Sequence, residues 1–167
     1  QKGDLANVSK ISEAIKKQNE LMLSLKKIKT KNQVNSAENL DVKSLYSKLE
    51  KDKAIMVEYF SGFERIYIFT LVNQRIKLEN INITDTAIPK IFSFLDYFND
   101  ANKITDNITG YNHLGNSVYK MLQLPTNSTY KNLIIIPDGI LNFLPFEALI
   151  TKETTTTNFA LMHYLLN

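Results

Sequence analysis

Residues 132–150 read NLIIIPDGILNFLPFEALI, and this stretch decides which fold we expect. It begins with Leu133–Ile136, four apolar residues in succession, and a short run of this kind is typical of a strand buried on both faces. We therefore expect a central strand in a sheet that helices cover. Asp138 and Gly139 then turn the chain, and Pro145 interrupts any regular strand pairing further on.

Three more strands are expected before this stretch. Ala54–Phe60 is rich in residues that favour strands, Arg65–Val72 alternates apolar side chains in a period of two, and Arg75–Ile83 repeats Ile and Leu. The connections Ser61–Gly62 and Asn73–Gln74 are short and rich in turn-forming residues. Adjacent strands joined by such short turns predict an antiparallel meander.

Helical patterns surround these strands. Residues 5–30 repeat apolar side chains every three or four positions, which predicts one long amphipathic helix whose apolar stripe needs a partner. The stripe has two possible packing partners: a neighbouring domain, or further helices of a helical-repeat array. We expect residues 1–40 to form a helical arm and linker and residues 41–167 to form the main α/β body.

The main body has four expected helices of its own. Asp41 is an N-cap residue for the first of them. Pro89 falls in the first turn of the second, where its missing N–H is not needed. We expect the four helices to run from Asp41 to about Lys51, from Thr86 to about Asn99, from about Gly110 to Leu124, and from Phe159 to Leu166.

Composition and charge exclude several classes of protein. The 167 residues are 44% hydrophobic and 22% charged, which is typical of a globular chain. The net charge of +3 arises in residues 1–53, which carry twelve Lys and seven Asp or Glu. These lysines lie mostly on the solvent side of the predicted helix, so we expect no nucleic acid partner. No apolar run is long enough to span a bilayer, and we expect no membrane partner.

The chain contains no cysteine. This excludes a disulfide framework, a thiolate metal site and a cysteine nucleophile within these residues, and it is consistent with a cytoplasmic protein. No Gly-x-Ser-x-Gly segment is present, and the five glycines are too scattered for a phosphate-binding loop. We expect no metal and no small-molecule cofactor. His113 and His163 are interpreted as surface or core histidines rather than ligands.

The segment Asn132–Ile150 resembles the signature block of CHAT domains, which are caspase-like domains often found behind helical repeats. The resemblance rests on an apolar strand followed by Pro-Asp-Gly and then by Leu-Pro-Phe-Glu-Ala-Leu. Val118–Leu122 with Pro125, the hairpin from Ala54 to Phe69, and His163–Leu165 are similar to the family more loosely, so that the resemblance covers roughly residues 40–167. The matching residues of the signature block are Pro137, Asp138, Gly139, Leu144, Pro145, Phe146, Glu147, Ala148 and Leu149.

The resemblance implies a bacterial cysteine endopeptidase in which a helical arm receives a signal and the core cleaves a protein. In the family, the catalytic His and Cys lie at the ends of later strands, which would follow residue 167. We therefore expect a cut chain that holds the N-terminal, non-catalytic part of the domain. No catalytic residue is assigned to it, and its partner would be another protein or the remaining C-terminal half. The alternatives are a non-catalytic signalling module of the same fold, or a structural fragment released by proteolysis.

Asp138 and Glu147 are the carboxylates of greatest interest in the signature block. Asp138 follows the predicted buried strand, and open α/β sheets place their ligands at the carboxyl ends of strands. One hypothesis is that Asp138 or Glu147 shapes a substrate cleft or orients a loop of the missing half. The other is that Asp138 closes a tight turn with Gly139 and that Glu147 makes only local contacts. If the sheet is incomplete, the chain by itself should also self-associate.

Overall fold

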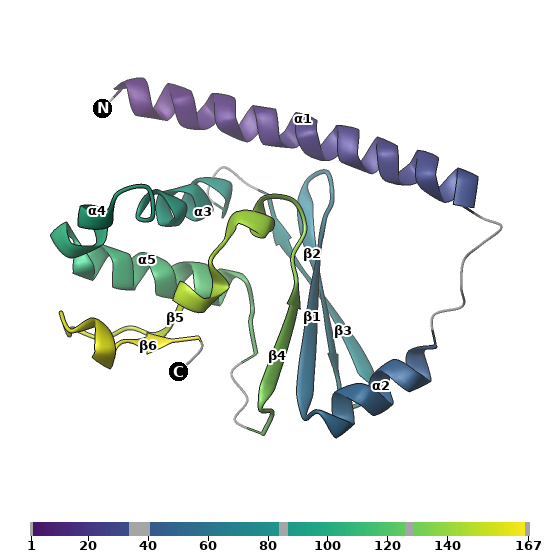
Figure 1. The fold of residues 1–167 in the computed structure, drawn as a ribbon. Coiled ribbons are helices and arrows are strands. Elements are labelled where there is room, and N and C mark those ends of the chain that lie inside the picture. The colour runs from purple at the N-terminus through teal and green to yellow at the C-terminus, as the bar shows by residue number, and fades with distance from the viewer. Residues whose placement is uncertain (1, 34–40, 84–86, 126–128, 166–167) are drawn as a thin grey trace. The chain divides into compact units, whose positions relative to one another are not determined.

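The computed structural model describes residues 2–33, 41–83, 87–125 and 129–165 (Figure 1). The chain divides into two compact units. The first unit comprises residues 1–83 and 127–139, and the second comprises residues 84–126 and 140–167. Of the arm and linker expected over residues 1–40, residues 34–40 lie outside the described residues, and residues 32 and 33 continue the first helix.

The first unit contains a mixed four-stranded sheet in the order β3-β2-β1-β4 (Figure 1). β1 (Ala54–Ser61), β2 (Arg65–Val72) and β3 (Arg75–Asn82) pair antiparallel, so the predicted meander is confirmed. β4 (Asn132–Ile136) pairs parallel with β1, although more than 60 residues separate them in the sequence. Helices together with a mixed sheet confirm the α/β class.

The apolar run Leu133–Ile136 forms β4, but the expected central position with both faces buried is wrong. β4 is an edge strand in which burial alternates, and the side chains of Ile134 and Ile136 are 42% and 40% exposed. The strand that has a run buried on both faces is β1, where Ala54–Val57 are buried in succession before exposed Glu58. Both segments are continuous apolar runs, and such runs do not tell which strand has neighbours on two sides.

Two helices belong to the first unit. α1 (Lys2–Gln33) is the predicted long helix and extends three residues beyond its expected end. α2 (Val42–Lys51) begins where expected, because the Asp41 carboxylate accepts a hydrogen bond from the Ser44 N–H at 3.1 Å. Its buried Leu49 packs in a cluster with Ala54, Met56 and Leu71. α2 thereby covers one end of one face of the sheet.

The second unit is built around α5 (Ile108–Met121), which packs against α3 (Ala87–Asp96). α4 (Ala101–Asp106) is a short helix that the sequence pattern did not predict. Pro89 lies in the first turn of α3, as expected. Buried Phe94 and Tyr111 stack on each other, and half-buried Tyr97 and exposed Phe98 pack edge-to-face against them, with centroids 5.3 to 6.3 Å apart.

The C-terminal part of the second unit is a short ribbon rather than a helix. The predicted helix from Phe159 to Leu166 is wrong: Phe159–Leu161 form a single 3₁₀ turn (η3), and β6 (His163–Tyr164) pairs antiparallel with β5 (Ile150–Lys152). The backbone extends at Met162, whose side chain is buried, and pairing with β5 ends the turn. The segment between β4 and β5 contains two more 3₁₀ helices, η1 (Gly139–Phe143) and η2 (Phe146–Ala148).

In the part of the chain that the structure describes, no helix has the length and apolar character needed to cross a membrane.

Candidate functional site at the carboxyl end of two parallel strands

The sequence-predicted residues Pro137, Asp138 and Gly139 follow β4 directly. β1 and β4 run parallel, with Glu58 opposite Ile136, so the residues after β4 meet Ser61 at the end of β1. Ligands of open α/β sheets bind at this edge, outside the carboxyl ends of parallel strands. We define the carboxyl-edge cluster as Lys26, Phe60, Ser61, Asp138 and Gly139, all of which belong to the first unit.

Asp138 connects the ends of the two parallel strands. Its Oδ2 accepts a hydrogen bond from the Ser61 backbone N–H at 2.9 Å, and its carbonyl oxygen accepts one from the Ser61 hydroxyl at 3.2 Å. Ser61 is buried, so the Asp138 carboxylate satisfies a backbone donor that has no access to water. Asp138 therefore does more than close a local turn, because it holds a residue 77 positions away.

The same carboxylate receives the ammonium group of Lys26 from α1. Lys26 Nζ lies 2.9 Å from Asp138 Oδ2 and 4.4 Å from the centre of the Phe60 ring, which is within the range of a cation–π contact. Burial raises the pKa of Asp138, but hydrogen bonds from Lys26 and the Ser61 N–H outweigh it and hold the pKa below its ordinary value. Asp138 is thus an ionised acceptor at neutral pH rather than a proton donor.

Gly139 is required by the geometry of this edge. Its backbone has φ +61°, in the left-handed region that side chains disfavour. A Cβ atom at this position would lie 2.5 Å from Ser61 Oγ, and buried Asn19 of α1 is nearby, with its Oδ1 3.6 Å away. The Asp-Gly turn predicted from the sequence is therefore present, and it is packed tightly against both β1 and α1.

The carboxyl-edge cluster can hold backbone segments in position, but its arrangement does not activate a nucleophile. The Ser61 hydroxyl donates to a carbonyl oxygen, so its proton is not directed toward a base. A serine nucleophile needs an adjacent base to take its proton. Among the described residues, no group of three or more His, Cys, Asp or Glu side chains could hold a metal ion. The cluster fixes the turn after β4 and anchors α1.

The remaining predicted residues lie apart from this cluster in the sequence, within the second unit. Leu144 is buried, Pro145 and Phe146 are half-buried, and Glu147 is exposed on η2. Each unit therefore holds one half of the signature block. Whether Glu147 shapes a cleft stays a prediction.

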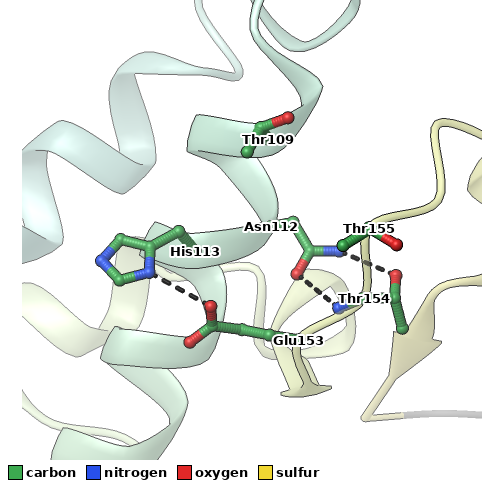
Figure 2. Close-up of a pocket in the computed structure, with 6 residues that line it drawn as sticks. All are labelled: Thr109, Asn112, His113, Glu153, Thr154 and Thr155. Atoms are coloured by element: carbon green, nitrogen blue, oxygen red, sulfur yellow. Dashed lines mark hydrogen bonds and ion pairs between the residues drawn. The ribbon is translucent and has the colours of Figure 1, made fainter.

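A second polar site lies within the second unit, between α5 and the segment after β5 (Figure 2). It is an open pocket of about 630 Å³. Buried Asn112 holds Thr154 twice, since its Nδ2 donates to the Thr154 hydroxyl and its Oδ1 accepts from the Thr154 N–H, both at 3.2 Å. The pocket is lined by Thr109, Asn112, His113, Glu153, Thr154 and Thr155.

His113 points toward Glu153, and its Nδ1 lies 3.2 Å from Glu153 Oε2 (Figure 2). The His113 side chain is 73% exposed, which confirms its interpretation as a surface histidine. His163 is also exposed, on β6. One helical turn beyond Asn112, the Asn116 Nδ2 donates to the Ile150 carbonyl at 2.9 Å. Asn112 and Asn116 thus bind the β5 segment to α5.

Sequence reasoning missed Lys26, Ser61, Asn112 and Asn116. For Lys26 and Ser61 no local signal exists, because each contacts Asp138 only through the tertiary fold. For the asparagines a signal was present: two polar residues four positions apart on the apolar side of a helix need buried hydrogen-bond partners.

Comparison with known proteins identifies no relative: no protein family, no curated protein and no solved structure matches this chain.

Proposed function

We propose that this chain is the N-terminal, non-catalytic part of a CHAT-type, caspase-like cysteine endopeptidase. One observation carries the proposal. The Pro137–Gly139 block, which bears the resemblance, ends β4 beside the carboxyl end of the parallel strand β1. This is the edge at which an α/β sheet of this kind binds its substrate.

In this proposal the chain supplies the scaffold of the site. The catalytic His and Cys would follow residue 167, at the ends of later strands, as the resemblance implies. The hydrogen bonds of Asp138 would hold the turn after β4 in position, and α1 would receive the activating signal. A thiolate, a base and donors for the developing oxyanion would complete the chemistry. The substrate would be a protein.

The test begins with the reading frame beyond residue 167. We expect a His and a Cys, each directly after an apolar strand-like segment. The complete protein should then cleave peptides from a library of fluorogenic tetrapeptides, and an alanine variant of that cysteine should lose cleavage by at least about 10⁴-fold. Peptide cleavage that persists in the alanine variant, or the absence of such a cysteine, would sink the proposal in favour of a non-catalytic module.

The contribution of the carboxyl-edge cluster can be measured in the same protein. Asp138→Ala releases the Ser61 N–H, and we expect kcat/KM to fall more than it does in Asp96→Ala. Asp96 is a matched control, because it is an exposed Asp with a lysine partner of its own, Lys103, at 2.7 Å. Equal activity of the two variants would show that the turn after β4 does not position the site.

A further inference from the structure

One face of the sheet in the first unit is largely open. The registers place Leu78, Phe69, Glu58 and Ile136 in one row that crosses all four strands on this face. Leu78 is 58% exposed, Ile136 is 40% exposed, and Phe69 is only partly buried. The neighbouring row contains Ile76, Leu71, Met56 and Ile134. We call these two rows the open sheet face.

α2 covers the middle of the second row, where Met56 and Leu71 are buried against Leu49, and the same cluster packs on Phe69 of the first row. The ends of that row, Ile76 and Ile134, are exposed. Glu58 shows how open the first row is, because it lies on β1, a strand with a neighbour on each side, and is nevertheless exposed. Within the described residues it forms no ion pair. Exposed apolar side chains that form a continuous patch mark an interaction surface.

α1 presents a second apolar surface. Leu21, Leu25 and Ile28 are each more than half exposed and follow the spacing of one helical stripe. At about 100° per residue, this stripe lies on the opposite side of α1 from Asn19 and Lys26, the residues directed toward the carboxyl edge. Among the α1 side chains that the structure describes, Asn19 and Lys26 attach the helix to its own unit, half-buried Leu23 lies on the same side, and the apolar stripe points away from that attachment.

α1 is basic, and the open sheet face holds a carboxylate. α1 carries eight Lys and three Asp or Glu, a net charge of +5, whereas the other residues of the first unit carry eight basic and eight acidic side chains. Exposed Lys10 and Lys17, seven residues apart, continue the line of the stripe toward the N-terminus of α1. The open sheet face has the carboxylate of Glu58 at its centre. An apolar stripe continued by two lysines fits an apolar face that carries a carboxylate.

We propose that α1 of one copy of this chain docks on the open sheet face of a second copy, and that the contact is reciprocal in a two-fold symmetric dimer. In this dimer Leu21, Leu25 and Ile28 cover the row from Leu78 to Ile136, and Lys17, one turn before Leu21, approaches Glu58. The proposal concerns self-association only and does not depend on the peptidase function proposed above.

Three considerations favour a second copy. The chain's own α1 is tied by Lys26 to Asp138, and this contact would have to break before the stripe could turn to its own sheet. Two α1 helices packed on each other would bring two charges of +5 together. A reciprocal contact also doubles the buried surface, toward the roughly 1,600 Å² of a standard stable interface.

The experiment is sedimentation equilibrium of the 167-residue chain. We expect a concentration-dependent dimer, with a mass twice the 19.2 kDa of the chain, populated by about 100 µM. Leu21→Gln/Leu25→Gln should weaken dimerisation at least about tenfold, because Gln maintains the helix and removes the apolar stripe. Leu78→Thr/Ile136→Thr should do the same through the sheet face, and Thr retains strand propensity.

Mixing the two double variants gives the decisive result. Each variant retains the surface that the other lacks, so a fluorescently labelled stripe variant should bind the sheet-face variant more tightly than either binds itself. Leu161→Gln is the matched control, since Leu161 is 63% exposed against 62% for Leu21 and lies outside both surfaces. It should leave the dimer unchanged. Far-UV circular dichroism establishes that all variants retain the fold.

Each other outcome overturns the proposal in its own way. A monomer at about 500 µM excludes the dimer. Loss of the dimer in the stripe variant alone indicates that two α1 helices pair with each other. A dimer that survives the stripe variant indicates association through the β4 edge or another surface. Binding of the stripe to vesicles of anionic lipid, without a dimer, identifies a membrane surface as the occupant. None of these results bears on whether the complete protein is a peptidase.

Discussion

The hydrogen bonds of Asp138 predict a specific difference between two substitutions. Asp138→Ala removes the acceptor of the Ser61 N–H and the partner of Lys26 at once. Asp138→Asn removes the charge and retains an amide oxygen in the place of the carboxylate oxygen. If the buried donor of Ser61 is what matters, the alanine variant should be much less stable than the asparagine variant.

The magnitudes follow from the surroundings of each contact. Leaving the buried Ser61 N–H without an acceptor costs about 1–3 kcal/mol. The pair with Lys26 is partly exposed, so its loss adds only about 0.2–1 kcal/mol. Asp138→Ala should therefore lower the free energy of unfolding by about 1–4 kcal/mol, and Asp138→Asn by no more than about 1 kcal/mol.

Two assays measure this difference. Urea denaturation followed by far-UV circular dichroism gives the free energy of unfolding of each variant. Amide hydrogen exchange measured by NMR reports the Ser61 N–H directly, and its protection should fall at least about tenfold in Asp138→Ala and remain close to wild type in Asp138→Asn. Asp96→Ala is the control, because it removes an exposed carboxylate that also pairs with a lysine.

The reasoning would be refuted by a protected Ser61 amide in the alanine variant. In that case the N–H has another acceptor, and the carboxylate does not join β1 to β4. Equal destabilisation by Asn and Ala would instead show that the charge interaction with Lys26, rather than the buried backbone donor, is the dominant contribution.

Three further predictions concern Asp138, the turn at Gly139 and the buried Asn116 of α5. The pKa of the Asp138 carboxyl is lowered in the folded state despite burial. The stabilisation of the fold by ionised Asp138 is therefore complete above the unfolded-state pKa and is lost as pH falls through the folded-state pKa. In urea titrations, the difference in unfolding free energy between wild type and Asp138→Asn should shrink between about pH 5 and pH 2. Gly139→Ala should cost at least about 1 kcal/mol by thermal or urea unfolding, because φ is +61° and the new Cβ meets Ser61 Oγ; unchanged stability would mean that the turn relaxes freely. Asn116→Ala should cost about 1–3 kcal/mol, since it leaves the buried Ile150 carbonyl without its donor, whereas alanine at exposed Asn102 should have little effect on the same urea curve.

Local patterns in the sequence predicted most of the elements. The period of two in Arg65–Val72 corresponds to β2 at both ends, and Asp41 caps α2 as expected. These features depend on neighbouring residues only, since a strand's alternation and a helix cap are decided within a few positions. The short helix α4 was missed because its six residues carry no sustained periodicity.

Long-range placement could not be predicted in the same way. The apolar run of β4 was expected at the centre of the sheet, but β1 occupies that place. The predicted C-terminal helix was replaced by β6, because pairing with β5 outweighed the local helical preference. Similarly, the sequence marked Asp138 as a residue of interest but gave no sign of Lys26 or Ser61.

The sequence by itself determined the α/β class, the meander, the Asp-Gly turn after an apolar strand and the long basic helix with its apolar stripe. Each of these is encoded in short-range periodicity, turn chemistry or composition. Only the tertiary structure decided that β4 is an edge strand, that Asp138 ties Ser61 to Lys26, and that the stripe of α1 is exposed. The contacts of Asp138 join residues that are 77 and 112 positions apart in the sequence. The exposure of a surface depends on which other elements pack against it. No local sequence pattern contains either kind of information.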